Sequence, residues 1–124
     1  MKSWRPTLAA VAAAAALAGA DLTQEKLRQA QSDAATWLMY GRNYSGWRYS
    51  ELRQINAANV ARLAPQWIFQ TGVGGKFETT PLVYDRMMYV TGPTNHAYAL
   101  DLLTGRQMWH YYKPLPPGVS ICCG

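Results

Sequence analysis

Four short strand-like runs separated by turn signals fill residues 78–112, and this pattern constrains the fold more than any other feature of the chain. Each run is rich in apolar, aromatic or β-branched residues, and the runs span 79–84, 87–91, 96–100 and 106–112. Connections this short join neighbouring antiparallel strands. The pattern therefore predicts one small antiparallel sheet, and an all-β fold.

The turns between these runs differ in how well their residues suit a tight turn. Asp85-Arg86 has the length of a tight hairpin loop, but such loops favour positive φ angles that Gly or Asn adopts most easily, so either the turn is of another type or Arg86 is strained. Before the fourth run, Asp101 can cap its own turn and Gly105 can adopt a left-handed conformation.

A four-stranded sheet of this size cannot bury both of its faces alone, so it requires neighbours stacked on each side. Trp109 follows the left-handed Gly105 by four residues. A Trp at this spacing fits either an ordinary sheet face or a repeated motif that joins one sheet to the next.

The first 20 residues have the pattern of a secretory signal peptide. Lys2 and Arg5 precede an apolar run over 8–18, and small residues occupy Ala18 and Ala20. The run is shorter than the roughly 20 residues that a membrane-spanning helix requires. We expect cleavage near Ala20, an exported mature chain without a membrane span, and a periplasmic location.

Residues 21–65 are predicted to form a helical and loop segment. The apolar spacing over 22–38 predicts a short helix with Asp21 or Thr23 as its N-cap. An aromatic-rich loop follows, and then a two-turn helix with Asn56 as its cap and Pro65 just beyond its end. Residues 66–124 are predicted to hold a strand over 66–71, containing Trp67, and then the sheet.

The charge pattern argues against a nucleic-acid partner. The net charge of +5 is spread along the 124 residues, without a basic stripe. His96 and His110 match no motif, and no role is assigned to them.

Two further features could carry chemistry. Glu78 follows a glycine-rich turn that lacks the Ser or Thr and the helix of a phosphate-binding loop, and an acid at such a place is usually solvated. Cys122 and Cys123 are the only cysteines of an exported chain. They could form a strained vicinal ring, pair with cysteines elsewhere or bind a metal, although two cysteines without His or acidic neighbours make a poor metal site.

Together these features resemble the quinoprotein alcohol dehydrogenases of the methanol and ethanol type, which use pyrroloquinoline quinone (PQQ). Residues 99–109 resemble the Trp-docking repeat of their eight-bladed β-propellers, in which the Trp of each blade packs on the turn of a neighbouring blade. Residues 40–67 resemble their mature N-terminus, and 121–124 resemble their cysteine pair. The resemblance covers 37–124.

The resemblance implies that the sheet is the first propeller blade, truncated, and that the strand over 66–71 closes the ring. It also implies that Glu78 reaches a carboxyl edge of PQQ and that Cys122 and Cys123 form a disulfide packed against the quinone. The family oxidises a primary alcohol by hydride transfer to PQQ, with calcium or a lanthanide ion, and passes electrons to a cytochrome c.

In the family the catalytic Asp and the metal ligands lie beyond the segment seen here, so the fragment alone is expected to be inactive. A rival of another class is a non-catalytic propeller that scaffolds outer-membrane protein assembly. The absence of a lipoprotein Cys at position 20, the cysteine pair and Glu78 all favour the dehydrogenase.

Overall fold

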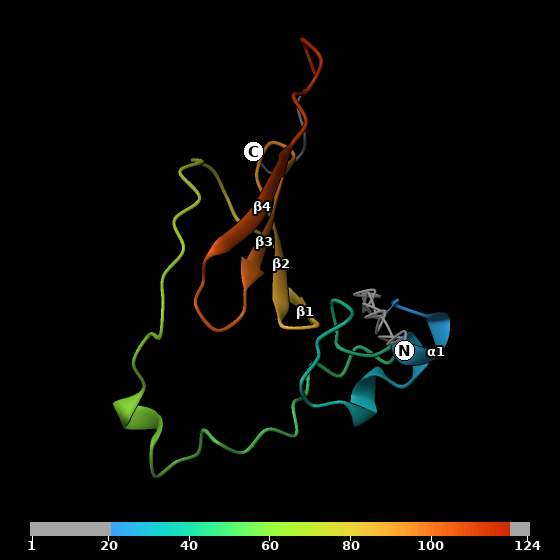
Figure 1. The fold of residues 1–124 in the computed structure, drawn as a ribbon, viewed down its shortest axis with the longest axis vertical. Helices are drawn as coiled ribbons and strands as arrows, with labels where there is room; N and C mark the ends of the chain where they lie inside the picture. The colour runs from blue at the N-terminus through green and yellow to red at the C-terminus, as the bar shows by residue number, and fades with distance from the viewer. Residues whose placement is uncertain (1–20, 120–124) are drawn as a thin grey trace, which may run out of the picture.

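The predicted sheet is present. The computed structural model describes residues 21–119. Its strands are β1 (Leu82–Tyr84), β2 (Met87–Gly92), β3 (His96–Asp101) and β4 (Gln107–Tyr112). They form one antiparallel sheet in the order β1-β2-β3-β4 (Figure 1). The all-β prediction is confirmed, although the first strand is shorter than the run that predicted it.

The hairpin turns settle the question raised by Arg86. Asp85 and Arg86 have φ angles of 47° and 61°, so both residues of the β1–β2 turn are left-handed and Arg86 carries the strain. In the β3–β4 turn, Asp101 Oδ1 accepts hydrogen bonds from the backbone of Leu103 and from both the backbone and the hydroxyl of Thr104. Gly105 is left-handed with a φ of 69°.

A β-bulge sets which side chains share a face of the sheet. Ala99 pairs with Trp109 whereas Leu100 pairs with Gln107, so Met108 is the extra residue on β4. Because side chains alternate along a strand, two faces result. The Tyr98 face carries Val90, His96, Tyr98, Leu100, His110 and Tyr112, and the Ala99 face carries Tyr89, Thr91, Ala97, Ala99, Trp109 and Tyr111.

The Tyr98 face is covered by the chain that precedes the sheet. The Phe69 ring meets the Tyr98 ring edge to face at 5.4 Å. The Phe77 ring lies so close to Gly92 that a Cβ there would be 3.0 Å from it. Tyr98 and Leu100 are consequently only 1% and 2% exposed, and they form the centre of the core.

The strand predicted over 66–71 is not assigned as a strand, because no other strand of residues 21–119 pairs with it. Its side chains pack on the sheet instead, as the contact between Phe69 and Tyr98 shows. A strand needs a hydrogen-bonded neighbour as well as the right residues, and only the residues are visible in sequence.

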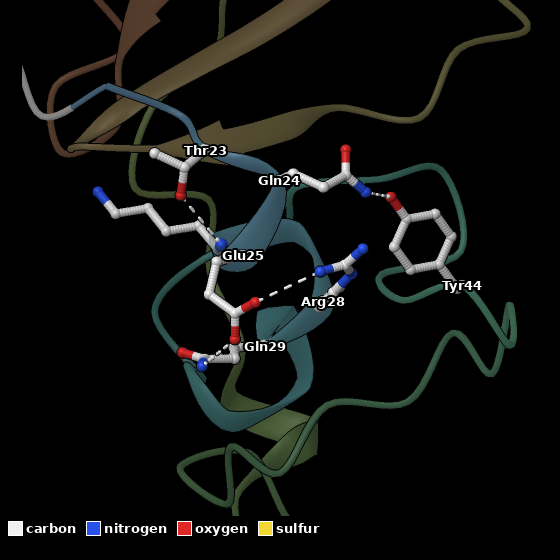
Figure 2. A network of polar contacts seen from close by, with 7 residues as sticks. Thr23, Gln24, Glu25, Arg28, Gln29 and Tyr44 are labelled. Carbon is white, nitrogen blue, oxygen red and sulfur yellow. Dashed lines mark hydrogen bonds and ion pairs between the residues drawn. The ribbon is translucent and has the colours of Figure 1, made fainter.

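The first helix is shorter than predicted. Helix α1 (Gln24–Arg28) begins at the predicted cap, where Thr23 Oγ1 accepts the backbone N–H of Lys26 (Figure 2). After one 3₁₀ turn, η1 (Ala30–Ser32), the chain becomes extended at Asp33. The prediction of a helix to residue 38 is wrong, because Asp33 accepts a hydrogen bond from its own neighbourhood, at Ala35 N–H, in place of the helical pattern.

Two contacts join this N-terminal segment to β1. Lys26 Nζ donates a hydrogen bond to Tyr84 Oη at 2.7 Å. Trp37 and Val83 exchange two backbone hydrogen bonds of 2.9 Å, which form an isolated bridge along the outer edge of β1. Figure 1 shows the N-terminal segment on the β1 side of the sheet.

The chain between the N-terminal segment and the sheet runs as a long arc away from the strands and back to them (Figure 1). It contains one 3₁₀ turn, η2 (Val60–Arg62), where two helical turns were predicted. The predicted cap, Asn56, accepts the Ala58 N–H in a local turn, but η2 begins after Asn59 and has no side-chain cap, so Asn56 does not cap it. Among residues 21–119 we find no helix with the length and hydropathy needed to cross a bilayer.

Candidate cofactor-binding edge

Glu78 lies between two anchored residues at the point where the chain enters the sheet. On one side Phe77 packs at Gly92, the last residue of β2. On the other side Thr91 Oγ1 donates a hydrogen bond of 2.9 Å to Thr79 Oγ1. The sheet therefore fixes the backbone on both sides of Glu78, although the residue itself lies outside any strand.

Glu78 lines a cavity of about 360 Å³ beside the sheet. Aromatic side chains supply much of its wall: Tyr89 and Trp109 have ring centroids 6.1 Å apart, and Tyr40 contributes from the N-terminal loop. The complete lining is Tyr40, Glu78, Thr79, Thr80, Leu82, Tyr89, Val90, Thr91, Ala97, Tyr98 and Trp109. Glu78 is its one charged side chain among residues 21–119.

The Glu78 carboxylate is exposed and forms no ion pair with a residue of 21–119. It is therefore available to accept a hydrogen bond from a ligand at the cavity. Pockets for organic ligands commonly start at about 300 Å³, with apolar and aromatic walls and a few polar groups that orient the ligand. This arrangement suits a flat aromatic molecule with a polar edge.

The other predicted cofactor contacts, Cys122 and Cys123, lie outside the described residues, as does the predicted signal peptide over 1–20. The disulfide therefore stays a prediction. Within 21–119 no group of three or more His, Cys, Asp or Glu side chains could hold a metal ion.

In the Trp-docking repeat that 99–109 resembles, a Trp packs on the turn of a neighbouring sheet. Trp67, which precedes the sheet, makes a contact of this kind with the β3–β4 turn. Its indole Nε1–H donates a hydrogen bond of 3.1 Å to the Leu102 carbonyl in the β3–β4 turn. Its ring lies against Gly105, where a Cβ would be 2.5 Å from ring carbons. Trp109 itself is 45% exposed. The sequence identified both Trp residues, but which turn Trp67 contacts was not predicted.

Sequence reasoning also missed Arg42, which is only 2% exposed. Its guanidinium donates to the carbonyls of Tyr49 and Gln31 at 3.0 and 3.4 Å and lies over the Trp37 ring, 5.7 Å from its centroid. These contacts hold the loop from which Tyr40 reaches the cavity. A Gly-Arg-Asn sequence gives no sign that its Arg will be buried.

Comparisons with known proteins identify what this arrangement is similar to. Residues 37–119 match the PQQ family described as "Glucose/ethanol/alcohol dehydrogenase, beta-propeller domain". A quinohemoprotein alcohol dehydrogenase, ADH-IIG, of Pseudomonas putida is 37% identical over 105 residues, which cover 85% of this chain and 15% of that protein. Subunit 1 of a methanol dehydrogenase (cytochrome c) of Methylobacterium organophilum is 43% identical over 114 residues, which cover 90% of this chain and 18% of that protein.

Solved structures of the same kind of enzyme are also similar to this chain. The quinohemoprotein alcohol dehydrogenase of Comamonas testosteroni has a TM-score of 0.69 at 33% identity, over 79% of this chain and 14% of that chain. A europium-containing methanol dehydrogenase has a TM-score of 0.65 at 40% identity, over 72% and 16%. The chain thus spans less than a fifth of the length of these relatives.

Proposed function

Because this chain belongs to the β-propeller family of PQQ-dependent glucose, ethanol and alcohol dehydrogenases, we propose that it supplies one edge of a PQQ site in an alcohol-oxidising enzyme. The observation that carries the proposal is Glu78, the one charged side chain in an aromatic-lined cavity of about 360 Å³. The Glu78 carboxylate is exposed and forms no ion pair with a residue of 21–119, so it can accept a hydrogen bond from a polar group of a ligand in the cavity.

The residues present fit one edge of the cofactor. PQQ is a flat aromatic tricarboxylate, which suits the walls formed by Tyr89, Trp109 and Tyr40. The Glu78 carboxylate tolerates a cofactor carboxyl group only if the two share a proton or a cation lies close, since two bare carboxylates within hydrogen-bond reach repel. The hydroxyls of Thr79 and Thr80 supply donors at the same wall.

The bound quinone would accept the hydride of the alcohol, and the residues of this chain would hold and orient it. We propose that a calcium or lanthanide ion, bound by residues beyond this segment, polarises the quinone carbonyl, and that a cytochrome c accepts the electrons. Support comes from the relatives: one is named for europium, and another for cytochrome c. The proposal also includes export to the periplasm, and a Cys122–Cys123 disulfide against the quinone face.

The first test is Glu78→Gln in the complete protein that contains this chain. The substitution keeps the shape of the side chain and one acceptor, but removes the charge and the ability to share a proton with a carboxylate. We expect normal folding, loss of PQQ during gel filtration, and a fall in alcohol-dependent dye reduction of about tenfold or more, the size of a lost charge-assisted hydrogen bond. Bound PQQ is measured by absorbance and turnover by dye reduction.

Glu51→Gln is the matched control, since Glu51 is also exposed but does not line the cavity. It should retain PQQ and turnover. A paired Cys122→Ser/Cys123→Ser variant should keep the propeller folded and lower turnover. PQQ retention and turnover equal to those of the parent in both the Glu78 and the cysteine variants would refute the proposed site. That result would favour the alternative, a non-catalytic scaffold protein.

A further inference from the structure

Tyr40 is unlike the other described residues that line the Glu78 cavity, because they all lie within 78–109 and it comes from the N-terminal loop. It is 62% exposed, so burial does not fix its ring. The Arg48 guanidinium lies over that ring, 4.6 Å from its centroid, and the Arg48 N–H returns to the Gly41 carbonyl at 3.1 Å. The loop therefore closes on itself beside Tyr40, and the contacts that place it against the sheet lie outside it.

Trp37 connects Tyr40 to the sheet. Its indole Nε1–H donates a long hydrogen bond of 3.4 Å to the Tyr40 carbonyl. Its backbone exchanges two hydrogen bonds of 2.9 Å with Val83 of β1. Val83 follows Leu82, which lines the same cavity as Tyr40. One residue thus joins two walls of the cavity that are far apart in the sequence.

The buried Arg42 fixes Trp37 and the loop together. Its guanidinium lies over the Trp37 ring, and its two terminal nitrogens donate to the carbonyls of Tyr49 and Gln31. No acidic side chain of residues 21–119 forms an ion pair with it, so carbonyl dipoles and an aromatic face surround the charge. The planar fork of a guanidinium binds two carbonyls at once, and it therefore ties three separate parts of the N-terminal segment to one point.

We propose that Arg42 is a positioning residue of the cofactor edge, which acts through Trp37 and holds Tyr40 where a flat ligand of the cavity contacts its ring. The inference rests on the proposed function, in which that ligand is PQQ. Arg42 does not line the cavity itself. It orders the Tyr40 wall before the cofactor arrives, so that binding does not have to immobilise the loop.

The test is a double-mutant cycle in the complete protein, freed of PQQ, with the affinity for added PQQ as the readout. Arg42→Met removes the guanidinium but keeps a long side chain, and it bears the same backbone strain, because Arg42 is left-handed with a φ of 72°. Tyr40→Ala removes the wall. Each should weaken the affinity about fivefold or more, the scale of a lost aromatic contact or charged hydrogen bond.

The double variant decides between positioning and general stabilisation. If Arg42 acts through Tyr40, the double variant binds PQQ no more weakly than Tyr40→Ala alone, because no wall is left to position. A merely structural effect of Arg42 would instead add to that of Tyr40. Arg42→Lys keeps the charge but not the planar fork, and it repeats the cycle if the methionine variant does not fold.

A second readout needs no cofactor. In the protein without PQQ, Arg42→Met should speed amide hydrogen exchange over 40–49 and leave β2 and β3 as protected as in the parent. Arg62→Met is the matched control, since Arg62 is exposed and does not line the cavity. It should equal the parent in both PQQ affinity and exchange.

The outcomes separate this inference from the proposed function. Additive losses in the double variant, or an Arg42→Met protein that binds PQQ as tightly as the parent, would overturn the role of Arg42 and leave that of Glu78 untouched. A coupled cycle together with an unchanged affinity in Glu78→Gln would refute the role of Glu78 alone. A complete protein that binds no PQQ would refute both.

Discussion

At position 105 the backbone conformation and the packing of Trp67 both require glycine. It is left-handed, with a φ of 69°, and the ring of Trp67 occupies the space where a side chain would begin. Two separate requirements, one of backbone conformation and one of close approach, therefore select glycine there. Gly72 has the same φ of 69° but nothing within 4 Å of its Cβ position, so the chain contains its own control.

We predict that Gly105→Ala destabilises the complete protein more than Gly72→Ala. Both substitutions incur the strain of a left-handed alanine, about 1–2 kcal/mol, and only Gly105→Ala also displaces the Trp67 ring, which adds about 1–3 kcal/mol of overpacking. Parallel urea or thermal unfolding of the two variants measures the difference. Equal losses of stability would mean that Trp67 does not need the close approach at Gly105.

At the level of elements, the parts that depend on local sequence were predicted well. The β2–β3 and β3–β4 hairpins follow from alternating residues and from turn residues such as Asp101 and Gly105. One failure is local, and the others lie where distant contacts decide. The helix over 22–38 stops early at residues whose side chains bond locally, and residues 66–71 pack on the sheet without a paired strand. The cavity at Glu78 was likewise invisible, since Tyr40 reaches it from another segment.

The β3–β4 turn should respond to acid. Hydrogen bonds from the Thr104 hydroxyl and backbone lower the pKa of Asp101 below its ordinary value of 3.8. A carboxyl group with a depressed folded-state pKa stabilises the fold above its unfolded pKa, and this stability is lost as the pH falls through the folded value. We expect the turn to lose protection against amide hydrogen exchange as the pH falls below 3.8.

Mass spectrometry of peptides covering 101–105 in the complete protein measures this effect. In Asp101→Asn the neutral amide still accepts a hydrogen bond, so protection should start lower and stay level over the same pH range. An acid-dependent loss in the variant that equals that of the parent would assign the effect to another group.

In the part of the chain that the structure describes, the buried apolar residues are few. Among residues 21–119 they are Ala30, Leu38, Tyr98, Ala99 and Leu100. Phe69 and Phe77 cover the Tyr98 face at Tyr98 and Gly92. Trp37 bridges the outer edge of β1, but on the Ala99 face Trp109 and Tyr111 are 45% and 56% exposed. All six residues of β4 are exposed, and no further strand of residues 21–119 pairs with its outer edge. Such a sheet requires a neighbour.

We therefore predict that residues 21–119 produced alone bind a hydrophobic dye strongly and unfold without a sharp cooperative transition, whereas the complete protein melts cooperatively. Trp109→Lys should lower dye binding by the isolated segment, because it breaks the exposed aromatic surface formed with Tyr89. A sharp melt of the monomeric segment, with protected amides across β1 to β4, would contradict the prediction.

The docking of Trp67 also bears on the order in which parts of the protein fold. The hydrogen bond from Trp67 to Leu102 joins residues 35 positions apart, whereas each hairpin of the sheet closes over a few residues. Short loops close in microseconds and distant contacts form later, after the entropy of the longer loop has been lost. We therefore expect the chain before the sheet to dock only after the hairpins have formed. We also expect it to be the first part to detach when the protein unfolds.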